Sequence, residues 1–552
     1  MQVIDNFNRF CVLLDCSRNA VPTVDFLKTY IDDIAKMGYN ALQLYTEDTY
    51  EIDGEPFFGY LRGRFTKNEL KDINAYAKKR GVEIIPCIQT LAHLNAPLRW
   101  SAYRDILDCR FTLLCEENKT YDLIDKMFKT MRECFDTKYI NIGMDESPFV
   151  GLGNYLRKHG YKSQHDVILN HLNKVCDIAK KYDFKPIMWS DMWFSIASKN
   201  EQHRSSEPFN FTDELLSKIP ENISLCYWDY YSPNPPVTEN MFNEHKRFNR
   251  EIWFAGSVWS SRGYAPFNLF AMKSHNSTIN ACKKHGVKNV IITAWGDDGA
   301  ENSRLATYSG LYHAICVAKG ITDPEEMDKG FYKLFGISLN NHAKLDLPNM
   351  IEEQFDLYSF DKARAMNPSK YMLYQDPFMG IFDYTYNKDS EKYYDVHAKT
   401  LAKFADNEKF GYVFDTLSKL CSVLSIKYSL GVKTRSAYKN GDKKELKSLI
   451  KSYNLLHKKL DDLYTAFKYQ WHKENKSIGW EVSDQRLGGL IKRVESCKNT
   501  LNDYLKGKID KIEDLEQEIL PDNKSNTFGK AILSTHYVNI ISANVVSYPE
   551  LI

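Results

Sequence analysis

The segment YINIGMDE at residues 139–146 shows the pattern on which the fold prediction depends. A short apolar run leads into two adjacent acids, Asp145 and Glu146, and Pro148 and two glycines follow. An apolar run of this length, bounded by turn-forming residues, is typical of a buried β-strand that ends in a polar loop.

Seven further segments share this pattern. In chain order the eight are FCVLLD (10–15), ALQLYTED (41–48), VEIIPCIQT (82–90), YINIGMDE (139–146), KPIMWSD (185–191), ISLCYWDYY (223–231), EIWFAGSVW (251–259) and KNVIITAWGDD (288–298). Helical patterns lie between them, for example at 26–40 and 69–82, each with a glycine near its end as at helix C-termini. Strands whose apolar residues do not alternate are buried on both faces, and eight β–α units close into a (β/α)8 TIM barrel. An open, doubly wound sheet is the alternative.

Beyond residue 320 the strand patterns fade and helical patterns dominate. Steps of four and three residues separate Leu449, Tyr453, Leu456, Leu460, Leu463 and Phe467, which indicates a helix-packing seam. We therefore predict a catalytic barrel over 1–320 and a mainly α-helical C-terminal domain over 321–552. The polar, glycine-bearing stretch at 475–490 is predicted to pack between helices; a loop that reaches the barrel mouth is the alternative.

Composition excludes several classes of partner. The 73 basic and 72 acidic side chains give a net charge of +1, so there is no general attraction for nucleic acid or anionic membrane. No segment approaches the roughly 18 apolar residues of a membrane span, and the first apolar run is too short for a signal peptide. The 12 cysteines show no pairing or metal-ligand spacing. These features predict a cytoplasmic protein without a metal or organic cofactor, and they are compatible with a homodimer.

Tryptophans gather where the later strands end. Four of the nine tryptophans, Trp189, Trp228, Trp259 and Trp295, close the last four strand segments, and Asp191, Asp229 and Asp297 lie close by. In a barrel, the residues that follow the strands meet at one rim, where the chemistry is built. Flat aromatic walls with carboxylates at their edges suit a sugar, whose C–H face packs on a ring while its hydroxyls need polar partners.

The acid pair suggests a reaction. Two carboxyls held this close cannot both ionise freely, so one is expected to keep its proton and to act as a general acid. A separate carboxylate nucleophile would need to lie about 5 Å away across the sugar, which sequence neighbours do not naturally provide. Adjacent acids fit substrate-assisted hydrolysis better, because there the sugar's 2-acetamido group is the nucleophile.

These residues resemble glycoside hydrolase family 20, the β-N-acetylhexosaminidases, whose fourth strand ends on His-x-Gly-Gly-Asp-Glu where this chain has Asn141-Ile-Gly-Met-Asp145-Glu146. LLDCSRNAVP (13–22), IQTLAHL (88–94) and AWGDDGAE (294–301) are similar to the family's LD-x-x-R-x-x-x-P, its third-strand segment ending in Pro-Gly-His and its Trp-Gly-Glu. The likeness covers residues 8–320. It is greatest to the intracellular branch without an N-terminal β-domain, which includes hexosaminidase D and some bacterial exo-hexosaminidases.

The resemblance implies roles for individual residues. Glu146 would be the general acid and then the base, and Asp145 would orient the acetamido N–H. His93, with Glu47 or Asp48, would steady Glu146. The residues expected to bind substrate are Trp189, Trp228, Trp259, Trp295, Asp297, Asp191 and Arg18.

Two family residues are displaced in this chain. The arginine that binds the 3- and 4-hydroxyls would fall at Phe10, so Arg9 and Arg18 become the candidates, and we predict Arg18. The tyrosine that donates to the acetamido carbonyl is absent after Trp259. The candidates for that role are Tyr230, Tyr231 and Tyr264, of which we predict Tyr230.

The resemblance thus implies an exo-acting retaining β-N-acetylhexosaminidase that removes terminal GlcNAc or GalNAc from small carbohydrates. Two alternatives stay open. One is a retaining glycosidase that uses a separate carboxylate nucleophile, Asp191 or Asp297. The other is a non-catalytic sugar-binding barrel, although a binding protein has no need of an acid pair.

Overall fold

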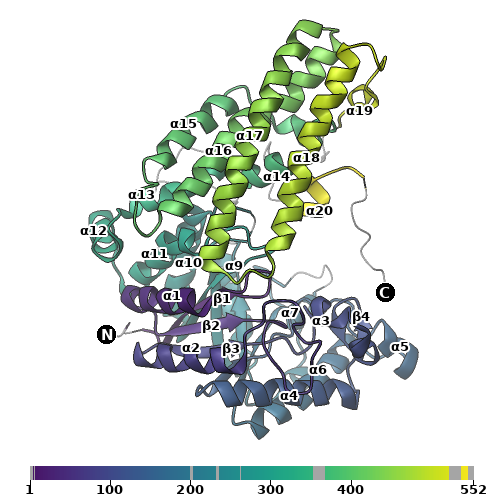
Figure 1. Ribbon diagram of the computed structural model, residues 1–552. Coiled ribbons are helices and arrows are strands. Elements are labelled where there is room, and N and C mark those ends of the chain that lie inside the picture. The colour runs from purple at the N-terminus through teal and green to yellow at the C-terminus, as the bar shows by residue number, and fades with distance from the viewer. Residues whose placement is uncertain are drawn as a thin grey trace.

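Eight parallel strands close into a barrel in the computed structural model, which describes residues 4, 6–198, 203–231, 235–261, 263–351, 367–520 and 536–544 (Figure 1). The strands are β1 (Arg9–Asp15), β2 (Ala41–Tyr45), β3 (Glu83–Cys87), β6 (Tyr139–Asn141), β7 (Lys185–Trp189), β8 (Ser224–Trp228), β9 (Glu251–Ser257) and β10 (Asn289–Ala294). Each pairs with the next in the chain, and β10 pairs with β1. The predicted barrel is confirmed, and the open sheet is excluded. A short antiparallel pair, β4 (Leu107–Cys109) and β5 (Thr112–Leu113), lies in the connection after β3.

Helices with well-formed ends surround the barrel. In α1 (Val24–Met37), the Thr23 side chain accepts from the Phe26 N–H, and Gly38 ends the helix in the left-handed conformation. The α2 helix (Lys67–Lys79) begins with a reciprocal capping box between Thr66 and Glu69. The other long helices are α4 (Asn118–Cys134), α6 (Gln164–Lys181), α9 (Pro235–Lys246), α10 (Asn268–His285) and α11 (Tyr308–Lys319). Shorter helices in this part are α3 (Asn95–Leu98), α5 (Asn154–His159), α7 (Asp191–Ala197) and α8 (Asp213–Lys218).

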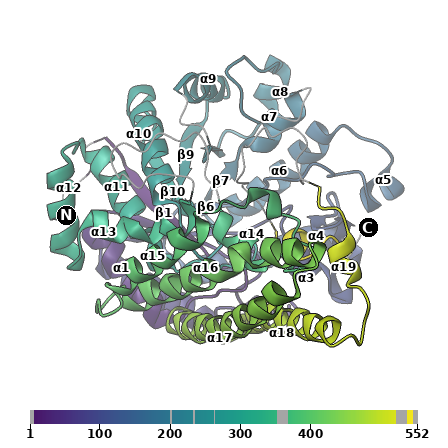
Figure 2. The ribbon, with the colours of Figure 1, turned by 90° about the horizontal axis from the view of Figure 1, so that it is seen from above.

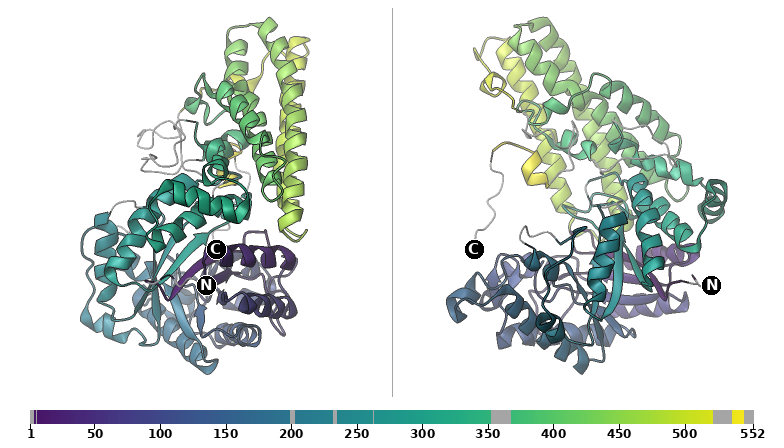
Figure 3. Two further views of the ribbon diagram at one scale, coloured as in Figure 1. Left: turned by 90° about the vertical axis from the view of Figure 1, so that its left-hand side faces the viewer. Right: turned by 180° about the vertical axis from the view of Figure 1, so that it is seen from behind.

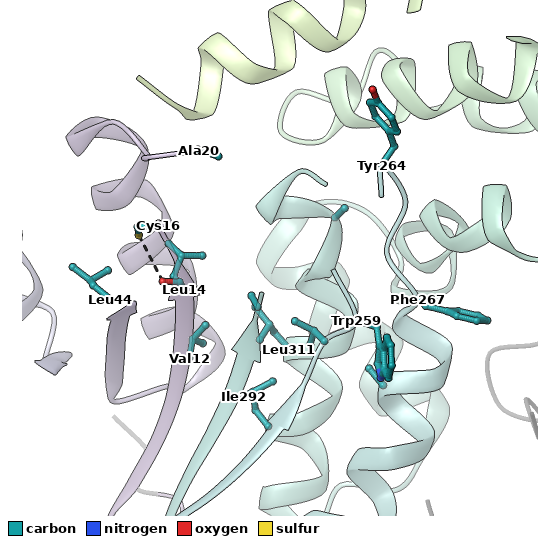
Figure 4. Packing of buried hydrophobic residues seen from close by; sticks show 14 of the residues in the cluster. Val12, Leu14, Cys16, Ala20, Leu44, Trp259, Tyr264, Phe267, Ile292 and Leu311 are labelled. Atoms are coloured by element: carbon teal, nitrogen blue, oxygen red, sulfur yellow. Dashed lines mark hydrogen bonds between the residues drawn. The ribbon is translucent and has the colours of Figure 1, made fainter. Parts of the chain in front are cut away.

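The strands are buried on both faces, as their continuous apolar runs predict. Cys11 and Leu13 of β1 belong to the cluster that fills the barrel interior. Val12 and Leu14 point the other way, into the layer between the sheet and the helices, where Leu311 of α11 lies (Figure 4). This double burial holds each strand rigidly and therefore holds the residues that follow its C-terminal end.

The C-terminal region is helical. Its elements are α12 (Pro324–Phe335), α13 (Leu339–Ala343), α14 (Pro368–Tyr374), α15 (Ser390–Ala402), α16 (Gly411–Lys439), α17 (Lys443–Glu474), α18 (Trp480–Leu505), α19 (Glu513–Glu516) and α20 (Tyr537–Ile540). The long helices α16, α17 and α18 lie side by side, α17 in contact with both others (Figure 2). All six residues of the predicted seam lie on α17 and are buried. The predicted boundary at 320 falls on Gly320, the C-cap of α11, and stays a prediction.

The lower ends of α17 and α18 rest on the barrel (Figures 1 and 3). The Lys476 N–H donates to the Val21 carbonyl at 2.8 Å, and the Arg304 guanidinium donates to Asn475. The stretch at 475–490 therefore does reach the barrel mouth, and the prediction that it packs only between helices is wrong for its first residues. Its backbone bonds the loop that follows β1. Across the described ranges, no helix combines the length and hydropathy of a membrane span.

Candidate active site

A cleft of about 690 Å³ opens among the loops that follow the C-terminal ends of the strands. It is lined by ten of the eleven predicted site residues: Arg18, His93, Asp145, Glu146, Trp189, Trp228, Tyr230, Trp259, Trp295 and Asp297. Asp191 is the exception. It is buried beneath the cleft, where its carboxylate accepts from the Glu146 N–H at 3.0 Å and from Trp228 Nε1 at 3.4 Å.

The backbone after β6 explains how two neighbouring acids can serve one site. Gly143, Met144 and Glu146 all have positive φ angles, of 71°, 71° and 47°. Side chains in a regular strand alternate between two faces, but these left-handed residues break the alternation just past the strand. Glycine suits position 143 for a second reason, because a Cβ would lie 2.0 Å from the Gln89 side-chain oxygen and would have to displace that amide. Met144 has a φ angle that glycine adopts without strain. The motif His-x-Gly-Gly-Asp-Glu has a glycine at this position.

Asp145 is held as a carboxylate. Gln89 Nε2 donates to its Oδ1 at 2.8 Å, and His93 Nε2 lies 3.3 Å from its Oδ2. Burial alone would raise the pKa of Asp145, but the charge of His93 and the two polar contacts outweigh it and hold the pKa below the usual range. Asp145 is therefore ionised at neutral pH.

Glu146 has the opposite character. Removal from water raises the pKa of its carboxyl, and the neighbouring Asp145 charge raises it further. Its side chain is nevertheless 59% exposed, into the cleft. Burial and the charge of Asp145 also raise the pKa of Asp191 above its usual range. Glu146 is thus the carboxyl that is both accessible and inclined to keep a proton.

His93 lies between the two acids. Its Nε2 is 3.6 Å from Glu146 Oε2 as well as close to Asp145, and its ring stacks on Phe111 at 5.8 Å. Burial would lower the pKa of His93, but the carboxylates outweigh it and raise that pKa to about 9. The resemblance pairs His93 with Glu47 or Asp48, and the charge of Glu47 does contribute to the raised pKa of His93. Each of the two acids also has a partner of its own. Glu47 accepts from the Tyr45 hydroxyl at 2.9 Å, and Asp48 accepts from an arginine, Arg62, at 3.3 Å.

The same three groups are the candidate for a cation. Among the residues that the structure describes, only His93, Asp145 and Glu146 form a trio whose ligand atoms all lie within 4.8 Å of one another. The carboxylates raise the pKa of His93 to about 9, so a cation at this point would have to displace a proton from the ring. The arrangement is therefore better suited to hydrogen bonding than to metal binding.

Aromatic rings form the floor and one wall of the cleft. Trp189 is buried at the floor, and Trp295 lies across it at 6.1 Å with an interplanar angle of 55°. Tyr230 stacks on Trp228 at 5.1 Å. Trp259 donates from Nε1 to the Tyr230 carbonyl at 3.0 Å. The rim tryptophans thus gather as the strand ends predict, around a space open beside the acids.

Position on β1 separates the two candidate arginines. Arg9 begins the strand, at the opposite end of the barrel, and pairs with Glu83 at 2.7 Å. Arg18 follows the strand and lines the cleft, where its guanidinium lies 3.5 Å from Glu47 and 3.8 Å from Asp297. Of these two arginines, Arg18 is the one that can meet a ligand in this cleft.

The three candidate tyrosines separate in the same way. Tyr230 and Tyr231 line the cleft. Tyr264 is buried and points toward the helical region, where its hydroxyl lies 2.8 Å from that of Tyr374 (Figure 4). The alternative based on Tyr264 therefore has no support from the geometry.

Several residues of the site carry no recognisable signal in the sequence. Gln89 and Tyr45 lie in ordinary strand segments, and only their contacts with Asp145 and Glu47 reveal them. Arg486 of α18 and His536 also line the cleft, although they come from the helical region. No local pattern links such distant residues to a barrel rim, because tertiary packing alone brings them there.

Known proteins match both parts of the chain. Residues 9–232 match the family described as "Glycosyl hydrolase family 20, catalytic domain", and residues 350–534 match the "Glycoside Hydrolase 20C C-terminal domain". Hexosaminidase D of Homo sapiens is 23% identical over 223 residues, which are 39% of this chain and 43% of that protein. Hexosaminidase D of Bos taurus is also 23% identical, over 39% of this chain and 60% of its own length. The chain thus spans about half the length of these curated relatives.

Solved structures were compared as well. The GH20 exo β-N-acetylglucosaminidase from Vibrio harveyi, in complex with N-acetylglucosamine, aligns with a TM-score of 0.45 and 15% identity over 59% of this chain and 57% of its own. The N-acetyl-β-hexosaminidase of Streptomyces plicatus aligns with a TM-score of 0.44 and 17% identity over 60% and 69%. The two family matches, one to the barrel and one to the helical region, show that the chain belongs to glycoside hydrolase family 20.

Proposed function

We propose that this protein is an exo-acting retaining β-N-acetylhexosaminidase that removes terminal, non-reducing GlcNAc or GalNAc by substrate-assisted catalysis. The observation that carries the proposal is the opposite electrostatic setting of two neighbouring carboxyls. Asp145 is held ionised by His93 and Gln89, while Glu146 faces the cleft with a raised pKa. One acid and one carboxylate side by side are what this reaction needs.

In the first step, Glu146 donates its proton to the glycosidic oxygen. The acetamido oxygen of the bound sugar attacks its own anomeric carbon while the bond to the leaving oxygen breaks, and a cyclic oxazolinium ion forms. Asp145 accepts a hydrogen bond from the acetamido N–H and stabilises the positive charge that develops there. Because the nucleophile belongs to the substrate, its effective concentration is high without a second carboxylate.

In the second step, Glu146 acts as the base. Water attacks the anomeric carbon, gives a proton to the Glu146 carboxylate and opens the ring, which restores the acetamido group. Two inversions at one carbon leave the product with the β configuration of the substrate. His93 keeps Asp145 ionised through both steps, since its positive charge remains beside that carboxylate.

The rest of the cleft is assigned to binding. Trp189 and Trp295 would enclose the acetamido group and the sugar face, and Tyr230 would donate to the acetamido carbonyl, with Tyr231 as the alternative. Arg18 and Asp297 would hold the outer hydroxyls. Their proximity to each other, 3.8 Å, suits a pair that shares adjacent hydroxyls.

A separate carboxylate nucleophile is less well supported. Asp191 does not line the cleft, and both of its oxygens already accept hydrogen bonds. Asp297 does line the cleft, so it is the candidate nucleophile that remains for this alternative. A non-catalytic sugar-binding role would leave the strained backbone around Asp145 and Glu146 without a purpose, because strain of this kind usually persists where it serves chemistry.

The deciding experiment is release of 4-nitrophenol from its β-GlcNAc, β-GalNAc and β-glucoside derivatives. We expect turnover of the two acetamido sugars only, reduced in Asp145→Asn and Glu146→Gln by about 100-fold or more, because the first change removes the charge that stabilises the oxazolinium ion and the second removes the group that acts as acid and then as base. Turnover of the glucoside at a similar rate would favour Asp297 as nucleophile. Binding of GlcNAc without any turnover would favour the sugar-binding role.

The proposed setting is the cytoplasm, with short carbohydrates as the substrates. All 12 cysteines are unpaired and 11 are buried, which is the usual state of thiols in a reducing compartment. The lining of the cleft includes Trp189, which is almost fully buried, and a blocked floor of this kind suits a chain end better than the middle of a glycan. Fractionation of the source cells tests the location directly.

A further inference from the structure

The loop after β10 is a strained part of the cleft rim. Asp297 lines the cleft, and the next three residues, Asp298, Gly299 and Ala300, have φ angles of 55°, 114° and 50°. Left-handed residues in succession are unfavourable except at glycine, so neighbouring structure must hold this conformation. The contacts that hold this loop conformation also fix the position of Asp297.

Two basic side chains of the helical region form ion pairs with this loop. Lys370 of α14 lies 2.7 Å from Asp298 and 3.0 Å from Glu301. Arg486 of α18 lies 3.0 Å from Asp298 and 3.3 Å from Glu301, and it also donates to the Asp298 carbonyl at 2.7 Å. The side chains of Lys370 and Glu301 are each 1% exposed, so these charges are held away from water.

Arg486 contacts the loop backbone directly, and little space remains between its guanidinium and Gly299. The Asp298 carbonyl that accepts from Arg486 belongs to the peptide bond between Asp298 and Gly299, one residue beyond Asp297. A Cβ on Gly299 would lie 2.6 Å from Arg486 Nη1, so the guanidinium packs directly against the glycine. Further contacts surround the same point: the Tyr374 hydroxyl donates to Glu301 at 2.8 Å and the Tyr537 N–H donates to Asp298 at 2.7 Å.

A second arginine of α18 makes a different set of contacts, which are those of a purely structural charge. Arg493, two turns along α18, pairs with Asp376 and Asp514, which both belong to the helical region, and it does not line the cleft. Arg486 joins the helical region to the cleft rim and lines the cleft itself. The two arginines therefore form a matched pair for experiment.

We propose that Arg486 and Lys370 are positioning residues, through which the helical C-terminal region sets the loop at 296–301 and holds Asp297 against the outer hydroxyls of the sugar. The inference rests on the proposed function for its effect on turnover. The rigidity of the loop can be measured without any activity.

The test compares Arg486→Gln and Arg486→Lys with Arg493→Gln in the full chain. Hydrogen exchange is followed in the peptide that spans 294–303. The values of kcat and KM are measured on 4-nitrophenyl β-GlcNAc and on its 4-deoxy and 6-deoxy derivatives. We expect Arg486→Gln to speed exchange in that peptide and to lower kcat/KM on the parent sugar about tenfold or more, the usual effect of losing a charged hydrogen bond.

The sugar derivatives separate positioning from general damage. The loss should shrink on the derivative that lacks the hydroxyl bound by Asp297, Arg486→Lys should recover part of it, and Arg493→Gln should stay within about twofold of the unmodified protein. Equal losses on all three sugars, unchanged exchange in the loop, or an equal effect of Arg493→Gln would overturn the inference.

Two further results keep the test decisive. If Arg486→Gln does not fold, Arg486→Lys takes its place, because it keeps the charge but loses the planar fork that reaches Asp298 and Glu301 together, and smaller changes of the same kind in exchange and selectivity are expected. If the unmodified protein turns over none of the sugars, the proposed activity fails, but the exchange comparison still shows whether α18 holds the loop.

Discussion

At the scale of the residue, neighbours decide what each carboxyl can do. Asp145 and Glu146 are adjacent and chemically similar, yet Gln89 and His93 hold one ionised while burial and that charge favour the proton on the other. The local sequence predicts that the pair must share charge unequally, and it assigns the roles only through a resemblance. The contacts give a physical reason for the same assignment.

His93 should set the pH range of activity. Its charge lowers the pKa of Asp145 and also that of Glu146. Activity needs Asp145 ionised and Glu146 protonated, so it falls on the acid side through the first pKa and on the basic side through the second. Removal of the charge in His93→Gln raises both pKa values, and we expect both limbs of the kcat/KM profile to move to higher pH.

The matched control for that experiment is His159→Gln. His159 pairs with Glu117 at 3.1 Å and does not line the cleft, so its loss should leave the profile in place. A profile that keeps its limbs in His93→Gln, with only a lower maximum, would contradict a charge effect and leave His93 a packing role.

At the scale of the element, the direction of a strand decides function. Arg9 and Arg18 flank the same strand, but β1 carries one to the closed end of the barrel and the other to the cleft. Both are plausible in sequence, because Arg9 lies one residue from the family position at Phe10 and Arg18 lies in LLDCSRNAVP (13–22), which resembles the family's first-strand motif. The direction of β1 in the sheet decides at which end of the barrel each arginine lies.

The two arginines offer a direct comparison. Arg18→Lys keeps a charge but loses the planar fork that meets several oxygens at once, so we expect KM for 4-nitrophenyl β-GlcNAc to rise about tenfold. Arg9→Lys should leave both kcat and KM nearly unchanged, since its partner Glu83 is at the opposite end. Equal effects of the two substitutions on KM would mean that Arg18 does not touch the substrate.

At the scale of the whole molecule, the helical region is bonded to the barrel mouth. Glu474, at the end of α17, is almost fully buried and accepts from the Ser303 hydroxyl, from the Arg304 N–H at 3.1 Å and from the Tyr412 hydroxyl at 3.0 Å. Ser303 and Arg304 follow β10 in the chain, so this contact joins the end of α17 to the loop after β10. It couples the stability of the two regions.

Glu474→Leu should lower the free energy of unfolding by about 3 kcal/mol, because three buried donors lose their acceptor at once. Urea unfolding followed by tryptophan fluorescence measures the change, and Glu474→Gln, which keeps an acceptor oxygen, should lose less. Asp462→Leu removes an exposed acid from the same helix and serves as the control. Unfolding of the barrel at an unchanged urea concentration would contradict the coupling.

The sequence by itself determined the eight strands, the helices around them, the seam of α17 and the acid pair at the end of one strand. These features depend on local periodicity, on turn residues and on the order of elements along the chain, which a single sequence records. It also placed four tryptophans at the rim, because the C-terminal ends of parallel strands must meet.

Only the tertiary structure decided which arginine and which tyrosines face the cleft, that Gln89 holds Asp145, that Asp191 lies beneath the site and that Arg486 reaches it from α18. These are contacts between segments far apart in the chain, and no periodicity links their positions. They depend on how the helical region packs against the loops of the barrel, which is fixed by burial and by paired charges across the whole fold.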